Sequence, residues 1–122
     1  MTIGQAIDRI DEMYPNHFET ATKIAWLSEL DGKVHTEILK SHVGDVADFS
    51  GYSLESDLDT VLLIPFPYDN VYHRYLEMMI TQEYKEIDRY NQAAALYNAA
   101  YLEFANFYNR SHMPRNSGAF KF

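Results

Sequence analysis

Hydrophobic positions recur at helical spacing near the start of the chain and predict a first helix over residues 3–14. They follow one another at steps of three or four, at Ile3, Ala6, Ile7, Ile10 and Met13. Thr2, followed three residues later by Gln5, is typical of a capping box and places the helix start at residue 3. The stretch "YPN" at 14–16 ends the helix.

A second run of apolar positions predicts a helix over residues 20–41. Its members are again three or four residues apart, at Ile24, Leu27, Leu30, Val34 and Ile38. Gly32 lies inside this run and costs roughly 1 kcal/mol relative to alanine in a helix interior. The helix therefore has room for a local bend or break at that glycine.

The middle of the chain lacks helical periodicity. Residues 43–60 contain five acidic residues, no basic residue and two glycines, which predicts a loop with room for a short hairpin. "VLLI" at 61–64 reads as a brief extended segment. Pro65 and Pro67 keep the following residues out of a helix until about residue 68.

Residues 68–112 contain neither glycine nor proline, so propensity alone permits one helix of about 45 residues, close to 70 Å long. Such a helix is far longer than the average in a small domain. We therefore favour two helices, over 68–84 and 87–111, with a turn in the polar stretch "QEYKEIDRYN" at 82–91.

The last helix carries an aromatic seam. Its positions follow steps of 4, 3, 4, 3 and 4, a heptad pattern, at Tyr90, Ala94, Tyr97, Tyr101, Phe104 and Tyr108. Ala93, Leu96, Ala100 and Phe107 widen the face. We expect this face to be buried, either inside the monomer or between subunits.

Together these elements predict an all-α fold, a small bundle of about four helices, in a single domain. Residues 1–112 form the helical domain, with 43–67 as a loop and extended insertion, and residues 113–122 form a C-terminal arm. The 122 residues include no cysteine, which excludes disulfides, thiolate metal sites and a catalytic cysteine. The first residues do not resemble a signal peptide, and no 18 apolar residues run together, so we expect an intracellular protein without a membrane span.

Charge divides the chain into an acidic body and a basic end. The net charge is −8, which argues against a protein that grips nucleic-acid phosphates. Residues 1–109 hold seven Lys or Arg and 18 Asp or Glu, a net charge of −11, whereas residues 110–122 hold three bases and no acid. In the arm, apolar anchors alternate with bases, a pattern suited to a partner's groove. The predicted partner-binding residues are Met113, Pro114, Arg115, Phe120, Lys121 and Phe122.

Candidate chemistry is sparse. Asp69, His73 and Glu77 lie at i, i+4 and i+8, a spacing that suits metal ligands on one helix face. We favour an ordinary solvated face with i, i+4 pairing, because no second His/Glu pair with matching spacing follows. Nucleotide-binding, serine-hydrolase and zinc-protease motifs are missing from the sequence. We therefore expect no catalytic residue, no cofactor and no metal.

Three stretches resemble a known family. They are "KIAWLSELDGKVHTEI" at 23–38, "LLIPFPYDNVYHRYLE" at 62–77 and "YNAAYLEFANFYNRSHMP" at 97–114. In these the chain resembles the small head–tail connector (adaptor) proteins of tailed bacteriophages and prophages of Gram-positive bacteria. The acidic loop at 43–60 lies outside the resemblance.

The resemblance implies a structural virion protein of the head–tail neck, assembled in the host cytoplasm. It implies a ring, of 12 copies in this family, that docks under the portal protein through C-terminal residues, offers its other face to a stopper protein, and leaves a channel through which DNA passes without specific binding. The alternative is a stand-alone acidic helical regulator or DNA mimic that binds a basic host protein. An enzyme that uses Asp69, His73 and Glu77 lacks the further residues it would need.

Overall fold

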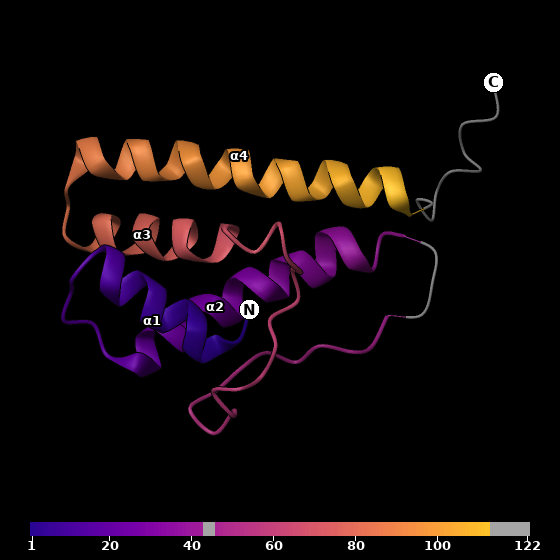
Figure 1. Ribbon diagram of the computed structural model, residues 1–122, viewed down its shortest axis with the longest axis horizontal. Helices are drawn as coiled ribbons and strands as arrows, with labels where there is room; N and C mark the ends of the chain where they lie inside the picture. The colour runs from indigo at the N-terminus through magenta and orange to yellow at the C-terminus, as the bar shows by residue number, and fades with distance from the viewer. Residues whose placement is uncertain (43–45, 113–122) are drawn as a thin grey trace.

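The computed structural model describes residues 1–42 and 46–112, and these residues form an all-α bundle. Within them lie four α-helices and one π-helix: α1 (Ile3–Met13), α2 (Thr20–Val34), η1 (His35–Leu39), α3 (Val71–Glu83) and α4 (Ile87–Ser111). Figure 1 shows α3 and α4 as an antiparallel pair, with α1 and α2 packed on the other side of α3. The predicted fold class is confirmed.

Helix α1 begins where the capping box predicts. The Gln5 N–H donates to Thr2 Oγ1 at 3.1 Å, and the Thr2 N–H donates to Gln5 Oε1 at 2.9 Å. Ile3, Ala6, Ile7 and Ile10 are buried. Met13 continues the apolar spacing and is the last residue of the helix, but its side chain is 52% exposed because it lies beyond Ile10, the last buried position.

Helix α2 continues through Gly32 without a break, and the departure from α-geometry comes three residues later. At His35 the chain changes to a π-helix, in which the Lys40 N–H donates to the His35 carbonyl at 2.9 Å. Asp31 and Val34, on either side of the glycine, are fully buried, so the helix is packed against the interior at this point. All five apolar positions predicted for this helix are buried, although its predicted end at residue 41 falls two residues past the π-helix.

The segment from residue 46 to residue 70 crosses the bundle without forming a helix. Its residues do not form a hairpin with one another in the part described; instead Val61 pairs with Thr2 in a single antiparallel bridge. The Ile3 N–H donates to the Thr60 carbonyl at 3.0 Å, and the Leu62 N–H donates to the Met1 carbonyl at 2.9 Å. Leu62 and Ile64 are buried, so the extended segment packs on the core beside the start of α1.

Two helices follow, as the polar stretch at 82–91 predicts. Hydrogen-bonded turns at residues 65–70 delay the start of α3 to Val71, three residues later than expected. The turn between α3 and α4 passes through Lys85, whose φ of 59° lies in the left-handed region. No helix of the described ranges combines the length and the apolar character that a bilayer span needs.

Candidate functional site

The aromatic seam of α4 lies against the interior of this subunit. Tyr97 and Phe104 are buried, whereas Tyr90, Tyr101 and Tyr108 are half-buried. The Tyr97 ring centroid lies 5.1 Å from that of Tyr75 on α3, and Phe104 lies 5.9 Å from Tyr108. The seam therefore takes part in the contact between α3 and α4 through Tyr97, and its rings pack on one another along α4.

Among the residues expected to widen the seam, Leu96 does not join it. Ala93 and Ala100 are buried and Phe107 is half-buried, but Leu96 is 46% exposed. At about 100° per residue, Leu96 lies about 40° from Ala100 and about 60° from Ala93 around the helix, so it is at the edge of the buried face. The seam is narrower than the sequence pattern predicts, and Leu96 lies at its exposed border.

Tyr101 connects the seam to the end of α2. Its hydroxyl donates to Glu37 Oε1 at 3.3 Å, and the Lys33 ammonium lies 4.9 Å above its ring. Burial, with Glu37 nearby, raises the pKa of Tyr101, and burial with the neighbouring Tyr75 raises that of Tyr97. Both phenols stay neutral at physiological pH and act as packing and hydrogen-bonding groups.

A histidine cluster fixes the C-terminal end of α4, where the predicted arm begins. His42 is buried, with Nε2 at 2.7 Å from Asn109 Oδ1 and Nδ1 at 2.6 Å from the Ile38 carbonyl. The rings of Tyr108 and His112 stack at 3.8 Å, and His42 meets the edge of Tyr108 at 4.7 Å. These contacts set the position from which the chain leaves the helix. The predicted partner-binding residues Met113, Pro114, Arg115, Phe120, Lys121 and Phe122 lie outside the described residues.

The most elaborate polar arrangement in the interior surrounds Asp31, which is fully buried. Its Oδ2 accepts from the Tyr52 hydroxyl at 2.5 Å and from the Leu63 N–H at 3.0 Å. Its Oδ1 accepts from the Tyr72 hydroxyl at 2.7 Å, and that hydroxyl in turn accepts from the Ile64 N–H at 2.7 Å. One carboxyl on α2 thus holds both the irregular segment and α3.

The electrostatics of this network follow from burial. Desolvation raises the pKa of Asp31, while the hydrogen bonds from Tyr52, Leu63 and Tyr72 oppose that rise. Desolvation and the neighbouring carboxylate raise the pKa of Tyr72 and of Tyr52. Since both tyrosines remain protonated donors and the described contacts leave no opening for a substrate at the carboxyl, we interpret the network as a structural clamp.

Sequence reasoning missed this clamp, although the sequence contains a signal. Asp31 lies four residues after Leu27 and three before Val34, which puts it on the apolar face of its helix. An acid on such a face needs buried donors. Its partners come from distant parts of the chain, so the sequence did not indicate which donors these would be.

The interpretation of Asp69, His73 and Glu77 as a solvated face is wrong for His73. This histidine is 5% exposed, and its Nδ1 has no hydrogen-bond partner. Burial, together with the positive charges of Arg9 and Arg74, lowers the pKa of His73 to about 4. The helix face turns inward because Tyr72 and Leu76 beside it are core residues. Within residues 1–42 and 46–112, no three acidic or histidine side chains gather as metal ligands would.

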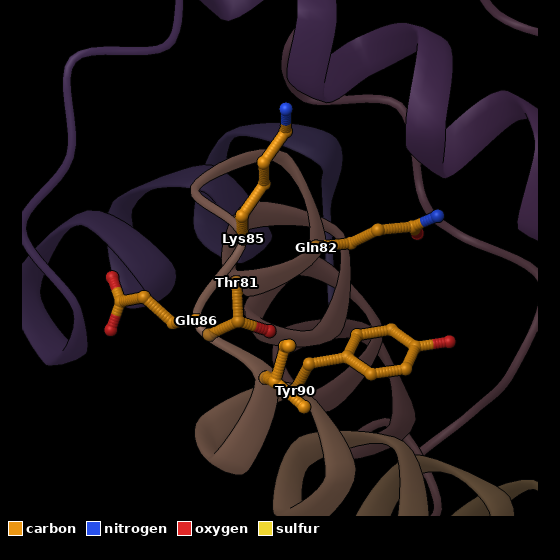
Figure 2. Close-up of a pocket in the computed structure, with 6 residues that line it drawn as sticks. Thr81, Gln82, Lys85, Glu86 and Tyr90 are labelled. Carbon is orange, nitrogen blue, oxygen red and sulfur yellow. The ribbon is translucent and has the colours of Figure 1, made fainter.

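A pocket of about 300 Å³ lies at the turn between α3 and α4, at the opposite end of α4 from the histidine cluster. Figure 2 shows the side chains around it: Thr81, Gln82, Lys85, Glu86, Ile87 and Tyr90. Two of its polar groups are engaged elsewhere, because the Thr81 hydroxyl donates to the Glu77 carbonyl and Glu86 accepts from the Tyr14 hydroxyl, each at 2.9 Å. The exposed lining of the pocket is mostly apolar.

The predicted site residues have three different outcomes in the structure. The aromatic seam lies inside the subunit. Asp69, His73 and Glu77 do not form a metal site within the described residues. The described residues end at 112, where the predicted arm begins. Comparison with protein-family models, with curated proteins and with solved structures found no match to this chain.

Proposed function

We propose that this protein is a head–tail connector adaptor, a structural and non-enzymatic subunit of a phage neck that docks under a portal. One observation carries the proposal: the three stretches that resemble the connector family pack on one another. Asp31 of the first stretch binds Leu63 and Tyr72 of the second. Tyr75 of the second packs on Tyr97 of the third. The resemblance therefore covers a connected interior and not three unrelated surfaces.

The division of charge supports a docking arm on an acidic body. The arm carries apolar anchors and bases, and the body carries a net charge of −11 over residues 1–109. A segment that orders on binding concentrates its affinity in a few aromatic anchors. In this proposal Phe120 and Phe122 enter a groove of the portal, and the histidine cluster at His42 and Asn109 sets the direction in which the arm leaves α4.

Acidic side chains on the surface support a role beside passing DNA. In the irregular segment, Asp48, Glu55, Asp57 and Asp59 are exposed. Negative walls repel phosphates and so oppose sticking. In the proposed ring, of 12 copies as in the family, such a surface lets DNA slide through the channel, while the face away from the portal meets a stopper protein.

The experiment is co-assembly of the purified chain with the portal protein encoded in the same phage or prophage genome, followed by size-exclusion chromatography with light scattering and electron microscopy. The full chain should form a second ring on the portal. Phe120→Ala with Phe122→Ala should abolish that ring. The free energy of unfolding of the helical body should stay within about 0.5 kcal/mol of wild type, as for changes outside a core. Leu54→Ala with Val61→Ala, two exposed positions of the irregular segment, serves as the matched control and should still assemble.

The acidic segment also favours a second candidate, a regulator or DNA mimic that binds a basic host protein. The two functions differ in what the arm contributes. A regulator would bind a basic DNA-binding protein through residues such as Glu55, Asp57 and Asp59 and would be displaced by duplex DNA. Failure to bind the portal, together with DNA-competed binding that the arm variant leaves unchanged, would replace the adaptor proposal with the regulator.

A further inference from the structure

Helix α4 has an outer face, the side turned away from α3. Figure 1 shows α4 along one edge of the molecule, with α3 beneath it. The residues of this outer face are all exposed: Asp88, Gln92, Ala95, Leu96, Ala99, Leu102, Glu103, Asn106 and Arg110. Two of them are large apolar side chains, Leu96 at 46% and Leu102 at 59% exposed. A helix of one domain ordinarily keeps such side chains on its covered side.

The outer face carries no charge from Gln92 to Leu102. Between Arg89 and Glu103 the sequence contains no acidic or basic residue. Helix α4 as a whole contains two acids and two bases, a net charge of zero in a chain of net charge −8. Because like-charged bodies repel, a helix of zero net charge is a place at which two copies of this acidic chain approach at low electrostatic cost.

The polar residues at the ends of the outer face are arranged symmetrically about Ala99. Asp88 precedes Ala99 by 11 residues and Arg110 follows it by 11, while Gln92 and Asn106 lie seven residues to either side. Asp88 and Arg110 of one chain are separated by 22 residues of helix, about 33 Å at 1.5 Å per residue. They therefore cannot pair within one subunit.

We propose that the outer face of α4 binds the same face of a second copy, antiparallel and about a two-fold axis at Ala99. In this arrangement Asp88 of each copy lies level with Arg110 of the other. Gln92 likewise lies level with the partner's Asn106. Ala95 and Ala99 let the two helix axes approach closely, and Leu96 and Leu102 cover the sides of the contact. We infer a second copy as the partner because the face is complementary to itself, as an isologous interface requires.

The size of the contact predicts a weak, concentration-dependent dimer. The 25 residues of α4 span about 37 Å, and a strip about 10 Å wide gives on the order of 400 Å² on each copy. A standard stable interface buries about 800 Å² on each partner. The dimer is independent of the proposed adaptor function, since it concerns the chain in the absence of any portal.

The test is sedimentation velocity of the full chain over a range of concentrations up to about 1 mM, the affinity expected of a weak contact. Wild type should show reversible dimerisation. Ala99→Glu, which places two like charges at the two-fold axis, should weaken the dimer at least about tenfold, a loss of about 1.4 kcal/mol. Asp57→Arg, on the irregular segment, is the control and should leave the dimer within about twofold, because that side chain lies outside the proposed contact.

A charge exchange tests the antiparallel pairing itself. Asp88→Arg and Arg110→Asp should each weaken the dimer about fivefold or more, by placing like charges together. The double exchange should restore it to within about twofold of wild type. Thermal melts of all variants distinguish loss of dimerisation from loss of folding. If Asp88→Arg frays the first turn of α4, the double exchange still tests the pairing, because it restores the opposite charges between the two copies.

Either of two outcomes overturns the dimer: a chain that stays monomeric throughout the concentration range, or dimerisation that Ala99→Glu leaves unchanged. A dimer that the double exchange fails to restore overturns the antiparallel pairing. Portal binding is measured separately with wild type and with Ala99→Glu. A failure of the dimer and a failure of the adaptor proposal therefore give different results.

Discussion

Replacing Asp31 by alanine is expected to lower the free energy of unfolding by about 2 to 3 kcal/mol. The substitution leaves three donors without an acceptor: the Tyr72 hydroxyl, the Tyr52 hydroxyl and the Leu63 N–H. A fully buried unpaired donor costs about 1–3 kcal/mol. Tyr72 is fully buried and bears that cost, whereas Tyr52 and Leu63 are partly exposed and recover part of their bonding with water. The loss is reduced because the variant no longer buries a carboxylate.

Asp31→Asn is the matched variant, because it keeps the shape and one acceptor oxygen. That oxygen is able to serve Tyr52 and Leu63 together, as Oδ2 does in the wild type. The amide NH₂ then faces the Tyr72 hydroxyl, which already accepts from the Ile64 N–H. Because one hydrogen bond of four is lost or redirected, we expect a cost of about 1 kcal/mol at neutral pH.

The assay is chemical denaturation of wild type and both variants, followed by circular dichroism and repeated from pH 7 toward pH 4. Burial raises the pKa of Asp31 above its ordinary value of 3.8, so the folded state binds its proton more tightly than the unfolded state does. The contribution of this group to stability is full below pH 3.8 and is lost as pH rises through the folded pKa. The deficit of Asp31→Asn relative to wild type should therefore grow as pH falls. The titration of His73 is common to both proteins and cancels in this difference.

The reasoning fails if Asp31→Ala is as stable as wild type at pH 7. That outcome would mean that the Tyr72 hydroxyl and the Leu63 N–H find other acceptors without cost. A deficit of Asp31→Asn that stays constant from pH 7 to pH 4 would instead show that burial does not raise the pKa of Asp31.

Three further predictions concern single residues. The pKa of His73 is lowered from 6.5 to about 4, which predicts a loss of stability of order 3 kcal/mol as pH falls between those values, at about 1.4 kcal/mol per pH unit. In denaturation experiments His73→Leu should flatten the dependence of stability on pH, and an unchanged dependence would contradict this prediction. Phe104→Ala should lower stability by about 3–5 kcal/mol, seen as a marked fall in melting temperature, because this ring is 1% exposed; an unmoved melt would show that the seam does not hold the monomer together. Gly51→Ala should destabilise the fold, because φ is 101° and an added Cβ would lie 2.7 Å from Ser28 Oγ; increased protease cleavage in residues 46–60 would report it, with Gly32→Ala as the control, since nothing lies within 4 Å of a Cβ there.

Local patterns in the sequence were sufficient for the helices whose signals lie within a few residues. The Thr2–Gln5 capping box places the start of α1, and the uninterrupted stretch after residue 68 resolves into α3 and α4 at the polar turn. These signals depend on backbone hydrogen bonds and on the 3.6-residue period, which act over one or two turns. The aromatic positions Tyr97 and Phe104 are found in the interior for the same reason.

Tertiary packing decided what periodicity left open. Gly32 stays helical because the neighbouring Asp31 is anchored by groups 21, 32 and 41 residues further along the chain. His73 is buried because α3 lies between two layers, which a solvated pattern at i, i+4 and i+8 does not reveal. Leu96 is exposed because α4 covers only one side of α3 and leaves its own outer face uncovered in the subunit.

The sequence by itself determined that this chain is a cysteine-free, acidic, helical protein with a basic, aromatic end, because composition and short-range periodicity are properties of the chain alone. Only the tertiary structure decided that a buried carboxyl on α2 binds the irregular segment and α3, and that the outer face of α4 is left uncovered in the subunit. Those features depend on which residues, distant in the sequence, lie together in the interior. Burial there strengthens hydrogen bonds and raises the cost of an unpaired polar group.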